Sequence, residues 1–116
     1  APGKVRDAMP TEVLGGFEHQ VLLAILRLGS EAYSVPIVLE LEERTGRAVA
    51  PSKVYVTLRR LENRGLLSSR FDPPPANEGG RERRVFSLEP AALEILKESK
   101  RVFASLWEDL PILEES

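Results

Sequence analysis

The sequence predicts a mainly α-helical domain with one small β-hairpin, which places it in the α+β class. Three observations support this prediction. Apolar residues recur at helical spacing in four segments, two short strand-like runs flank a tip rich in proline and glycine, and a glycine follows three of the helical segments. A chain of 116 residues with 42% hydrophobic residues can bury one compact core and is too short for a second independent domain.

The first helix is expected over residues 16–28 and ends at Gly29, the residue type preferred after a helix. Its apolar side chains cover more than one stripe of the helix: Phe17, Val21, Leu22, Leu23, Ile25, Leu26 and Leu28. A helix that is apolar nearly all round must be covered on both sides, and a domain of this size supplies only one cover. We therefore expect either a partner subunit or a C-terminal helix that folds back over it.

Two more helices follow. One is expected over residues 34–45, and the next starts at Pro51 or Ser52, after an extended link at 48–50, and ends at Gly65. This order of helix, turn, helix, link and helix is typical of a helix-turn-helix, whose last helix reads the major groove of DNA.

The third helix carries basic residues on the side that its apolar stripe of Val54, Leu58 and Leu61 leaves free. Seven residues lie on or beside that side: Ser52, Lys53, Tyr55, Val56, Arg59, Arg60 and Asn63. A merely solvated surface would also contain arginine and lysine, because both are good helix formers. Glu62 stands among these arginines and is expected to orient one of them.

Two strand-like runs, residues 66–71 and 81–88, flank the Pro- and Gly-rich tip and predict a hairpin, or wing. Arg81 and Arg83, with Arg84 beside them, stand at the base of the returning strand, where they suit contact with phosphates or a minor groove. Two basic elements on one side of a winged helix-turn-helix favour DNA binding over a solvated surface.

The charges are segregated along the chain. The formal net charge is −2, but residues 44–84 contain ten basic and four acidic residues, a local charge of +6 that leaves −8 on the rest. A basic middle third between acidic ends indicates a polyanion-binding face on an acidic body.

The last helix is expected over residues 89–110, with Pro111 stopping it. Residues at alternating spacings of three and four form a short heptad seam, interrupted by a lysine: Leu93, Leu96, Lys100, Phe103, Trp107 and Leu110. A homodimer is the simplest way to bury this seam together with the first helix. The expected dimer interface consists of seven residues: Phe17, Leu22, Leu26, Leu96, Phe103, Trp107 and Leu110.

The expected organisation has four parts. A flexible N-terminal segment (1–13) precedes a winged helix-turn-helix DNA-binding domain (14–88), a C-terminal dimerisation helix (89–110) and a short tail (111–116).

Composition argues against several classes of protein. Without cysteine there is no disulfide framework, thiolate nucleophile or Cys-based zinc site, and the single His19 cannot build a metal site alone. The sequence has no nucleophile-base set and no glycine-rich phosphate loop, so we expect no catalytic residue and no cofactor. No run approaches the roughly 18 apolar residues of a membrane span, and no signal-peptide pattern is present, so a cytoplasmic protein is expected. The competing hypothesis is a winged helix that binds an acidic protein partner.

The run YSVPIVLELEERTGRAVAPSKVYVTLRRLENRGLL, followed by GGRERRVFSLEPAA, resembles the winged-helix core of the PadR transcriptional regulators. The resemblance covers about Phe17 to Ala92 and is most specific from Tyr55 to Leu67, which contains the L-x-R-L-E-x-x-G-L pattern. It implies a bacterial or archaeal repressor that binds DNA and dimerises through its C-terminal region, with the single C-terminal helix of the family's short members.

The resemblance also implies roles for individual residues. Tyr55 matches the family's phosphate-contacting tyrosine, and Arg81 and Arg83 match its basic wing. The sequence departs from the family pattern at Lys53, where the family commonly has threonine, and at Val56, where it frequently has proline, and both positions bear on the operator sequence.

Some short members of the family bind flat aromatic compounds between tryptophans of the last helix. Trp107, the only tryptophan of the chain, is therefore expected to be either a stacking platform for a small aromatic effector or a large packing residue of the dimer. Packing is favoured, because an aromatic residue at a seam position is also what plain helix packing produces.

Overall fold

The computed structural model describes residues 14–74, 80 and 82–111. The predicted N-terminal segment 1–13, most of the hairpin tip, Arg81 and the end of the tail lie outside these residues.

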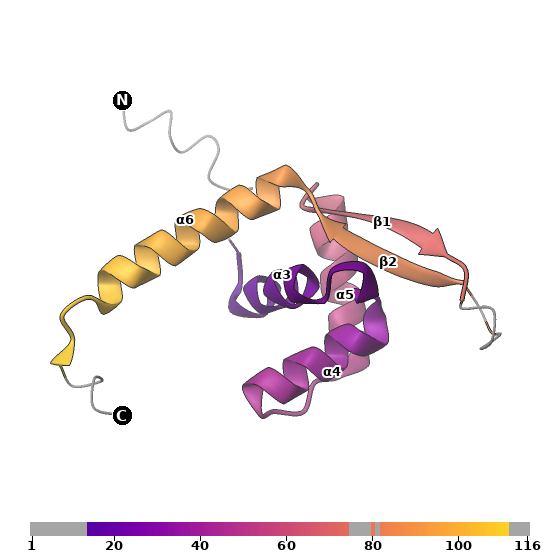
Figure 1. Cartoon of the computed structure of the whole chain (residues 1–116), viewed down its shortest axis with the longest axis horizontal. Helices are drawn as coiled ribbons and strands as arrows, with labels where there is room; N and C mark the ends of the chain where they lie inside the picture. The colour runs from indigo at the N-terminus through magenta and orange to yellow at the C-terminus, as the bar shows by residue number, and fades with distance from the viewer. Residues whose placement is uncertain (1–13, 75–79, 81, 112–116) are drawn as a thin grey trace.

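Within the described residues the elements follow the predicted order (Figure 1). They are α3 (Gly16–Leu28), the 3-10 turn η1 (Gly29–Glu31), α4 (Ser34–Thr45), α5 (Pro51–Asn63), β1 (Leu67–Asp72), β2 (Arg83–Leu88) and α6 (Pro90–Trp107). The predicted α+β class, with a winged helix-turn-helix followed by a C-terminal helix, is confirmed.

Local sequence explains where the helices begin and end. Pro51 and Pro90 occupy the first turns of α5 and α6, where the N–H that proline lacks has no helical acceptor. Gly46 ends α4 in the left-handed region, with φ of 73°. α6 ends at Trp107 rather than at the predicted Leu110, because the backbone turns extended at the next residue, with ψ of 134°.

The core lies where α3, α4 and α5 meet the base of the hairpin and the first turns of α6. It contains fifteen buried residues: Val21, Leu22, Ala24, Ile25, Ala32, Ile37, Leu41, Val54, Leu58, Leu61, Leu66, Leu67, Phe86, Ala92 and Leu96. In α4, α5 and α6 these residues recur at spacings of three or four, and in α3 they are two adjacent pairs three positions apart, which is the pattern of an amphipathic helix that buries one face. The opposite face of each helix therefore remains available for contacts outside the protomer.

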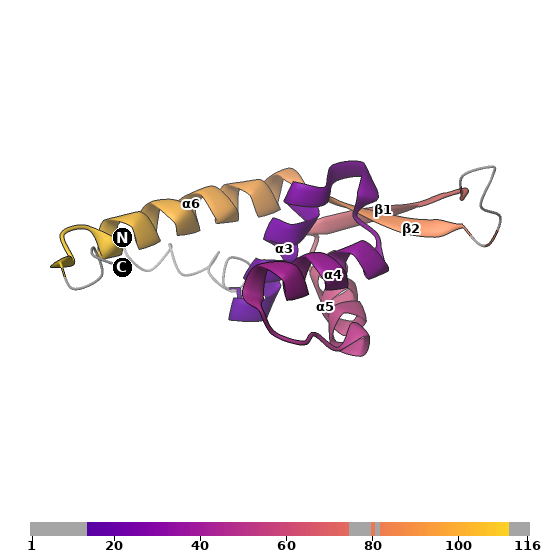
Figure 2. The same ribbon diagram turned by 60° about the horizontal axis from the view of Figure 1, so that its bottom comes forward.

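The hairpin is attached to the helices at its base. β1 and β2 pair antiparallel, with Leu67 opposite Leu88 and Asp72 opposite Arg83. The Phe86 N–H donates to the Ala32 carbonyl at 2.9 Å, which ties the segment before α4 to the free edge of β2. Beyond this attachment the strands project past the helices (Figure 2).

α6 leaves the core after its first turns. Ala92 and Leu96 are 0% and 6% exposed, whereas every described residue from Arg101 onward is exposed. In both views the helix runs away from the hairpin and past the three helices of the body (Figures 1 and 2). Its distal half is thus largely uncovered by the described part of the chain.

The predicted dimer interface needs correction at two residues. Leu22 and Leu96 belong to the core of the protomer, so they present no surface to a partner. Nine residues at about 100° each place Phe17 and Leu26 on opposite sides of α3, and the place of both in the interface stays a prediction. The apolar surface that α3 leaves exposed consists of Leu23 and Leu26, at 46% and 51%, and α6 does not fold back over these two residues.

Candidate nucleic-acid interface

α5 has one buried and one exposed face. Val54, Leu58 and Leu61 are at most 1% exposed, as their spacing predicts, and Thr57 is buried beside them. The Thr57 hydroxyl donates to the Lys53 carbonyl at 2.8 Å, so this buried polar group is satisfied within the helix. All six residues of α5 that were predicted to contact DNA are exposed: Ser52, Lys53, Tyr55, Val56, Arg59 and Arg60.

Aromatic rings hold two of the cations on the exposed face. The Lys53 ammonium lies 4.3 Å from the centroid of the Phe17 ring. Arg59 donates from Nη1 to the Tyr55 hydroxyl at 2.9 Å, and its guanidinium lies 5.8 Å from the centroid of the same ring. Within the described part of the chain neither cation forms an ion pair, so no carboxylate compensates their charge and the rings restrain their positions.

The remaining cations near the end of α5 are compensated by a carboxylate from α3. Glu18 accepts a hydrogen bond from Arg64 at 3.1 Å and lies 3.8 Å from Arg60. It also accepts from the Gly15 N–H at 2.9 Å, and its side chain is only 12% exposed. The positive charge of the helix that no described carboxylate compensates is therefore that of Lys53 and Arg59.

The first turn of α5, which contains Lys53, also offers a backbone donor. Ala50 is the N-cap residue and no side chain caps the helix. Pro51 has no N–H and the Lys53 N–H donates to the Ala50 carbonyl at 3.0 Å, which leaves the Ser52 N–H without a helical acceptor, and the helix dipole adds partial positive charge there. The exposed Ser52 occupies this turn, where a phosphate oxygen could accept from both its N–H and its hydroxyl.

The described part of the hairpin carries a second group of charges. Arg83 is at the tip end of β2, and its guanidinium lies 4.7 Å from the centroid of the Tyr33 ring, which restrains it beside the residue that precedes α4. On β1, Arg70 and Asp72 form a two-bond pair at 2.9 and 3.1 Å. Arg83 was predicted at the base of the returning strand, but it lies at the tip end of β2, opposite Asp72, because the strand runs from the tip toward Leu88 at the base.

Arg84, by contrast, bonds to α5. Its Nη2 donates to Glu62 Oε1 at 3.0 Å, and its Nε donates to the Ser69 hydroxyl at 3.0 Å. Glu62 was expected to orient an arginine of its own helix, but the arginine it bonds to lies 22 positions further along the chain. No local spacing reveals such a pair, because the hairpin alone brings β2 next to α5.

The distal half of α6 exposes an apolar surface. Phe103 and Trp107 are 54% and 56% exposed, and Leu110, just beyond the helix, is 41% exposed. Two neighbours that the predicted heptad seam did not include share this surface. They are Val102 and Leu106, which are 37% and 64% exposed. The sequence indicates these two residues through the overall apolar composition of the helix and not through the strict heptad spacing.

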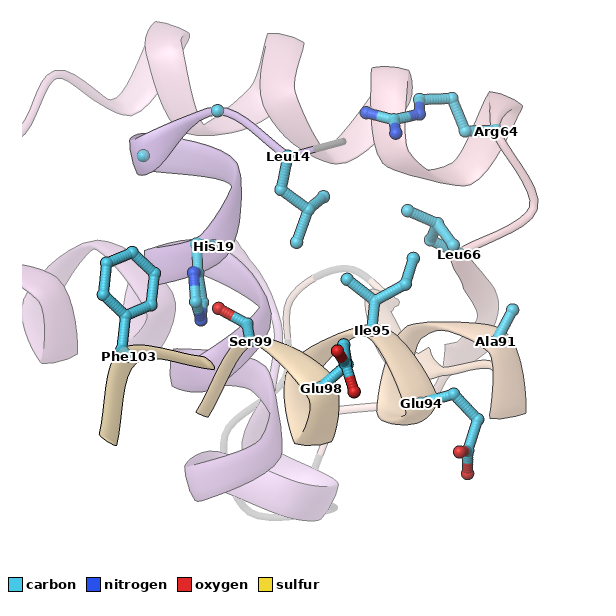
Figure 3. Close-up of a pocket in the computed structure, with 12 residues that line it drawn as sticks. Leu14, His19, Arg64, Leu66, Ala91, Glu94, Ile95, Glu98, Ser99 and Phe103 are labelled. Atoms are coloured by element: carbon cyan, nitrogen blue, oxygen red, sulfur yellow. The ribbon is translucent and has the colours of Figure 1, made fainter. Parts of the chain in front are cut away.

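A groove of about 780 Å³ separates the start of α3 from α6. Figure 3 shows His19, Ser99 and Phe103 toward one end of it and Arg64 and Leu66 toward the other. Glu98 lies along the same groove, and its pKa is below the usual value because Arg101 donates hydrogen bonds to it, the shorter at 2.6 Å, and adds positive charge. The groove brings together residues of α3 and α6 that are far apart in the sequence.

The described residues provide neither a metal site nor a membrane span. Among the residues that the structure describes, no group of three or more His, Asp or Glu side chains could hold a metal ion. None of the described helices is both long and apolar enough to cross a membrane.

Three packed helices, a hairpin wing and a basic third helix form the architecture of the winged helix-turn-helix class of DNA-binding proteins. Within that class, the model of the PadR-like transcriptional regulator family matches residues 22–100. The chain therefore belongs to the PadR-like family of DNA-binding transcriptional regulators, whose members are transcription factors rather than enzymes. No curated protein matches the chain significantly.

Solved structures show the same fold. A PadR-like transcription factor from Bacteroides fragilis has a TM-score of 0.64 and 26% identity, over 90% of this chain and 93% of that one. A PadR family regulator from Eggerthella lenta has a TM-score of 0.58 and 27% identity, over 84% and 86% of the two chains. A PadR family regulator from Clostridium difficile, at 20% identity and a TM-score of 0.64 over 78% and 91%, is similar in fold.

Proposed function

We propose that this protein is a transcriptional repressor that binds a palindromic operator as a homodimer. The observation that carries the proposal is the exposed face of α5, where aromatic rings hold Lys53 and Arg59 and no described carboxylate pairs with them. Such a face meets the negative potential of a DNA groove with its cations already positioned, which reduces the entropy lost on binding.

In this proposal α5 is the recognition helix and enters the major groove. Lys53 or Arg59 donates to the O6 and N7 acceptors of a guanine, and one good contact of this kind is worth about 1 to 3 kcal/mol of discrimination. The Tyr55 hydroxyl already accepts from Arg59, so its own O–H is free to donate to a phosphate oxygen. Ser52 and Val56 flank these contacts at the start and on the exposed side of the helix.

The hairpin supplies a second contact with the same duplex. Arg83 lies at the tip end of β2 beside the Tyr33 ring, and with Arg81 it is proposed to contact the backbone or the adjacent minor groove. Arg60 adds to the phosphate contacts only in part, since Glu18 lies 3.8 Å from it. Two separate contacts fix the orientation of the protein on DNA better than the helix alone.

The homodimer is proposed to form through the exposed apolar surface of α6, together with Leu26 of α3. Phe103, Trp107 and Leu110 make an uncovered patch at the end of a helix that projects from the body, and contiguous exposed patches of this kind typically mark interaction sites. Two copies related by a two-fold axis present two recognition helices, which is the symmetry of a palindromic operator.

The exposure of Trp107 supports a role in dimer packing more directly than a role in binding an aromatic effector. Its ring is half exposed within an apolar stripe, so a partner helix that covers the stripe also covers the ring. If a flat aromatic compound stacks on it as well, adding the compound to the dimer changes the tryptophan fluorescence and lowers operator affinity. If neither changes, the effector hypothesis is removed.

Selection of bound duplexes from a random DNA pool tests the proposal. Wild type is compared at near-physiological salt with a Tyr55→Ala, Arg59→Ala double variant, and Glu43→Gln serves as a control on the exposed side of α4. We expect wild type and control to recover one palindromic site and the double variant to recover none. Transcription from a template that carries this site should then fall when wild type is added.

The competing hypothesis of an acidic protein partner makes a different prediction. A basic face used only for protein association binds duplexes through charge alone, so no sequence is enriched and every duplex shows the same salt dependence. Recovery of an asymmetric site would retain specific DNA binding but remove the two-fold dimer.

A further inference from the structure

A closed set of three hydrogen bonds joins α5 to both strands of the hairpin. Arg84 on β2 donates to Glu62 on α5 and to the hydroxyl of Ser69 on β1, each at 3.0 Å. Ser69 in turn donates its hydroxyl to the second oxygen of Glu62 at 2.8 Å. Because the three side chains come from three different elements, this Glu62–Ser69–Arg84 cluster holds the helix and the two strands to one another.

The surroundings of the cluster restrain it further. The side chains of Glu62 and Arg84 are only 24% and 35% exposed, so the pair is less screened by water than an ordinary surface ion pair. The rings of Phe71 and Phe86 lie 5.6 and 5.7 Å from the guanidinium carbon of Arg84. Charge-assisted bonds with two partners and two flanking rings leave the guanidinium little orientational freedom.

Arg84 therefore differs from the cations of the proposed DNA contact surface. Lys53 and Arg59 are held by uncharged rings and keep their charge available, whereas the charge of Arg84 is compensated by Glu62. An arginine released next to the hairpin would bind phosphates of any sequence, because a phosphate contact carries no base information.

We infer that Glu62 is a positioning residue for DNA recognition, which fixes the hairpin against α5 and withholds Arg84 from DNA phosphates. The inference rests on the proposed sequence-specific binding. α5 and the hairpin touch one duplex at two places, so the angle between them determines whether both contacts form with α5 in register on the bases. A hairpin that can swing still finds phosphates, but on every sequence alike.

The experiment replaces Glu62 by glutamine, which keeps the size of the side chain and removes its charge. The control is Glu43→Gln, which removes the same charge from an exposed position on α4. Dissociation constants are measured across a range of salt concentrations for the selected operator and for a scrambled duplex. Thermal unfolding establishes that each variant is folded.

For Glu62→Gln we expect the ratio of operator to scrambled affinity to fall about tenfold, equivalent to about 1.4 kcal/mol. The salt dependence of scrambled binding should steepen by about 0.9 in the double-logarithmic slope, the value of one additional phosphate contact. In a double variant that also carries Arg84→Met, the slope should return to the wild-type value while the ratio stays low. Glu43→Gln should change neither quantity.

A Glu62→Gln ratio that matches that of Glu43→Gln overturns the inference, whatever the slope does. If Glu62→Gln does not fold, the same measurements on Ser69→Ala test the inference. This variant removes two of the three hydrogen bonds of the cluster and no charge. A lower ratio with an unchanged slope supports the inference, and an unchanged ratio overturns it. If wild type binds both duplexes equally, the proposed sequence-specific function is contradicted as well. If wild type prefers the operator, only the role inferred for Glu62 is contradicted.

Discussion

Replacing Trp107 by alanine is expected to dissociate the proposed homodimer. The residue is 56% exposed in the protomer. With about 250 Å² for a whole tryptophan, about 140 Å² is left for a partner to cover. At about 25 cal/mol per Å², covering it contributes at most about 3.5 kcal/mol per protomer, because association also costs rigid-body and side-chain entropy.

If the alanine variant loses only half of this free energy in each protomer, the dimer as a whole loses about 3.5 kcal/mol. At about 1.4 kcal/mol per tenfold, this loss raises the dimer dissociation constant more than a hundredfold. Sedimentation velocity over a dilution series into the low micromolar range measures this change. Trp107→Phe keeps an aromatic ring and should shift the constant less. Val35→Ala truncates an apolar residue that is 59% exposed on α4 and should leave the dimer intact.

Two results would refute the reasoning. Equal dimerisation of Trp107→Ala and Val35→Ala would mean that the apolar end of α6 does not form the interface, and a wild type that is monomeric at tens of micromolar would remove the dimer altogether. Because Trp107 is the only tryptophan, its fluorescence gives an independent readout. The emission of wild type should shift to longer wavelength as dilution exposes the ring.

Three further predictions concern base reading and the fold. Selection from a random DNA pool tests Lys53→Ala and Arg59→Ala. At least one of them should relax the preference at a base pair by about 1 to 3 kcal/mol. Unchanged preferences in both variants would contradict base contact by these two residues. Leu58→Ala should lower the free energy of unfolding by about 2 to 5 kcal/mol, because a side chain that is 1% exposed leaves a cavity in the core. Urea unfolding measures this, and a negligible loss would mean that the site is not packed as described. Gly46→Ala should cost about 1 to 2 kcal/mol, because φ is 73° there although nothing blocks a Cβ atom; an unchanged melting temperature would contradict the strain.

Much of the fold could be predicted because its signals are local. Helical periodicity identified the buried stripe of Val54, Leu58 and Leu61, and all three are at most 1% exposed. Gly46 and Pro51 marked the end of one helix and the start of the next, since each residue's own backbone geometry favours that place. The exposed basic face of α5 followed from the same stripe.

The errors in the predicted dimer interface arose where the sequence did not show which face of a helix is buried. α3 is apolar nearly all round, so its sequence did not indicate which leucines belong to the core. Leu22 is buried and Leu26 exposed because α4, α5 and β2 happen to cover the first and not the second. Leu96 was assigned to the dimer for the same reason, whereas it is 6% exposed and belongs to the core of the protomer.

By itself, the sequence determined the order of the elements, their approximate ends and which helix carries the uncompensated positive charge. These properties depend on residues within a few positions of one another, through backbone preference and helical repeat. Only the tertiary structure decided which cations are free to act. Packing brings Glu18 against Arg64 and Glu62 against Arg84 across 46 and 22 positions, and a contact at such separation depends on how the elements pack rather than on local spacing.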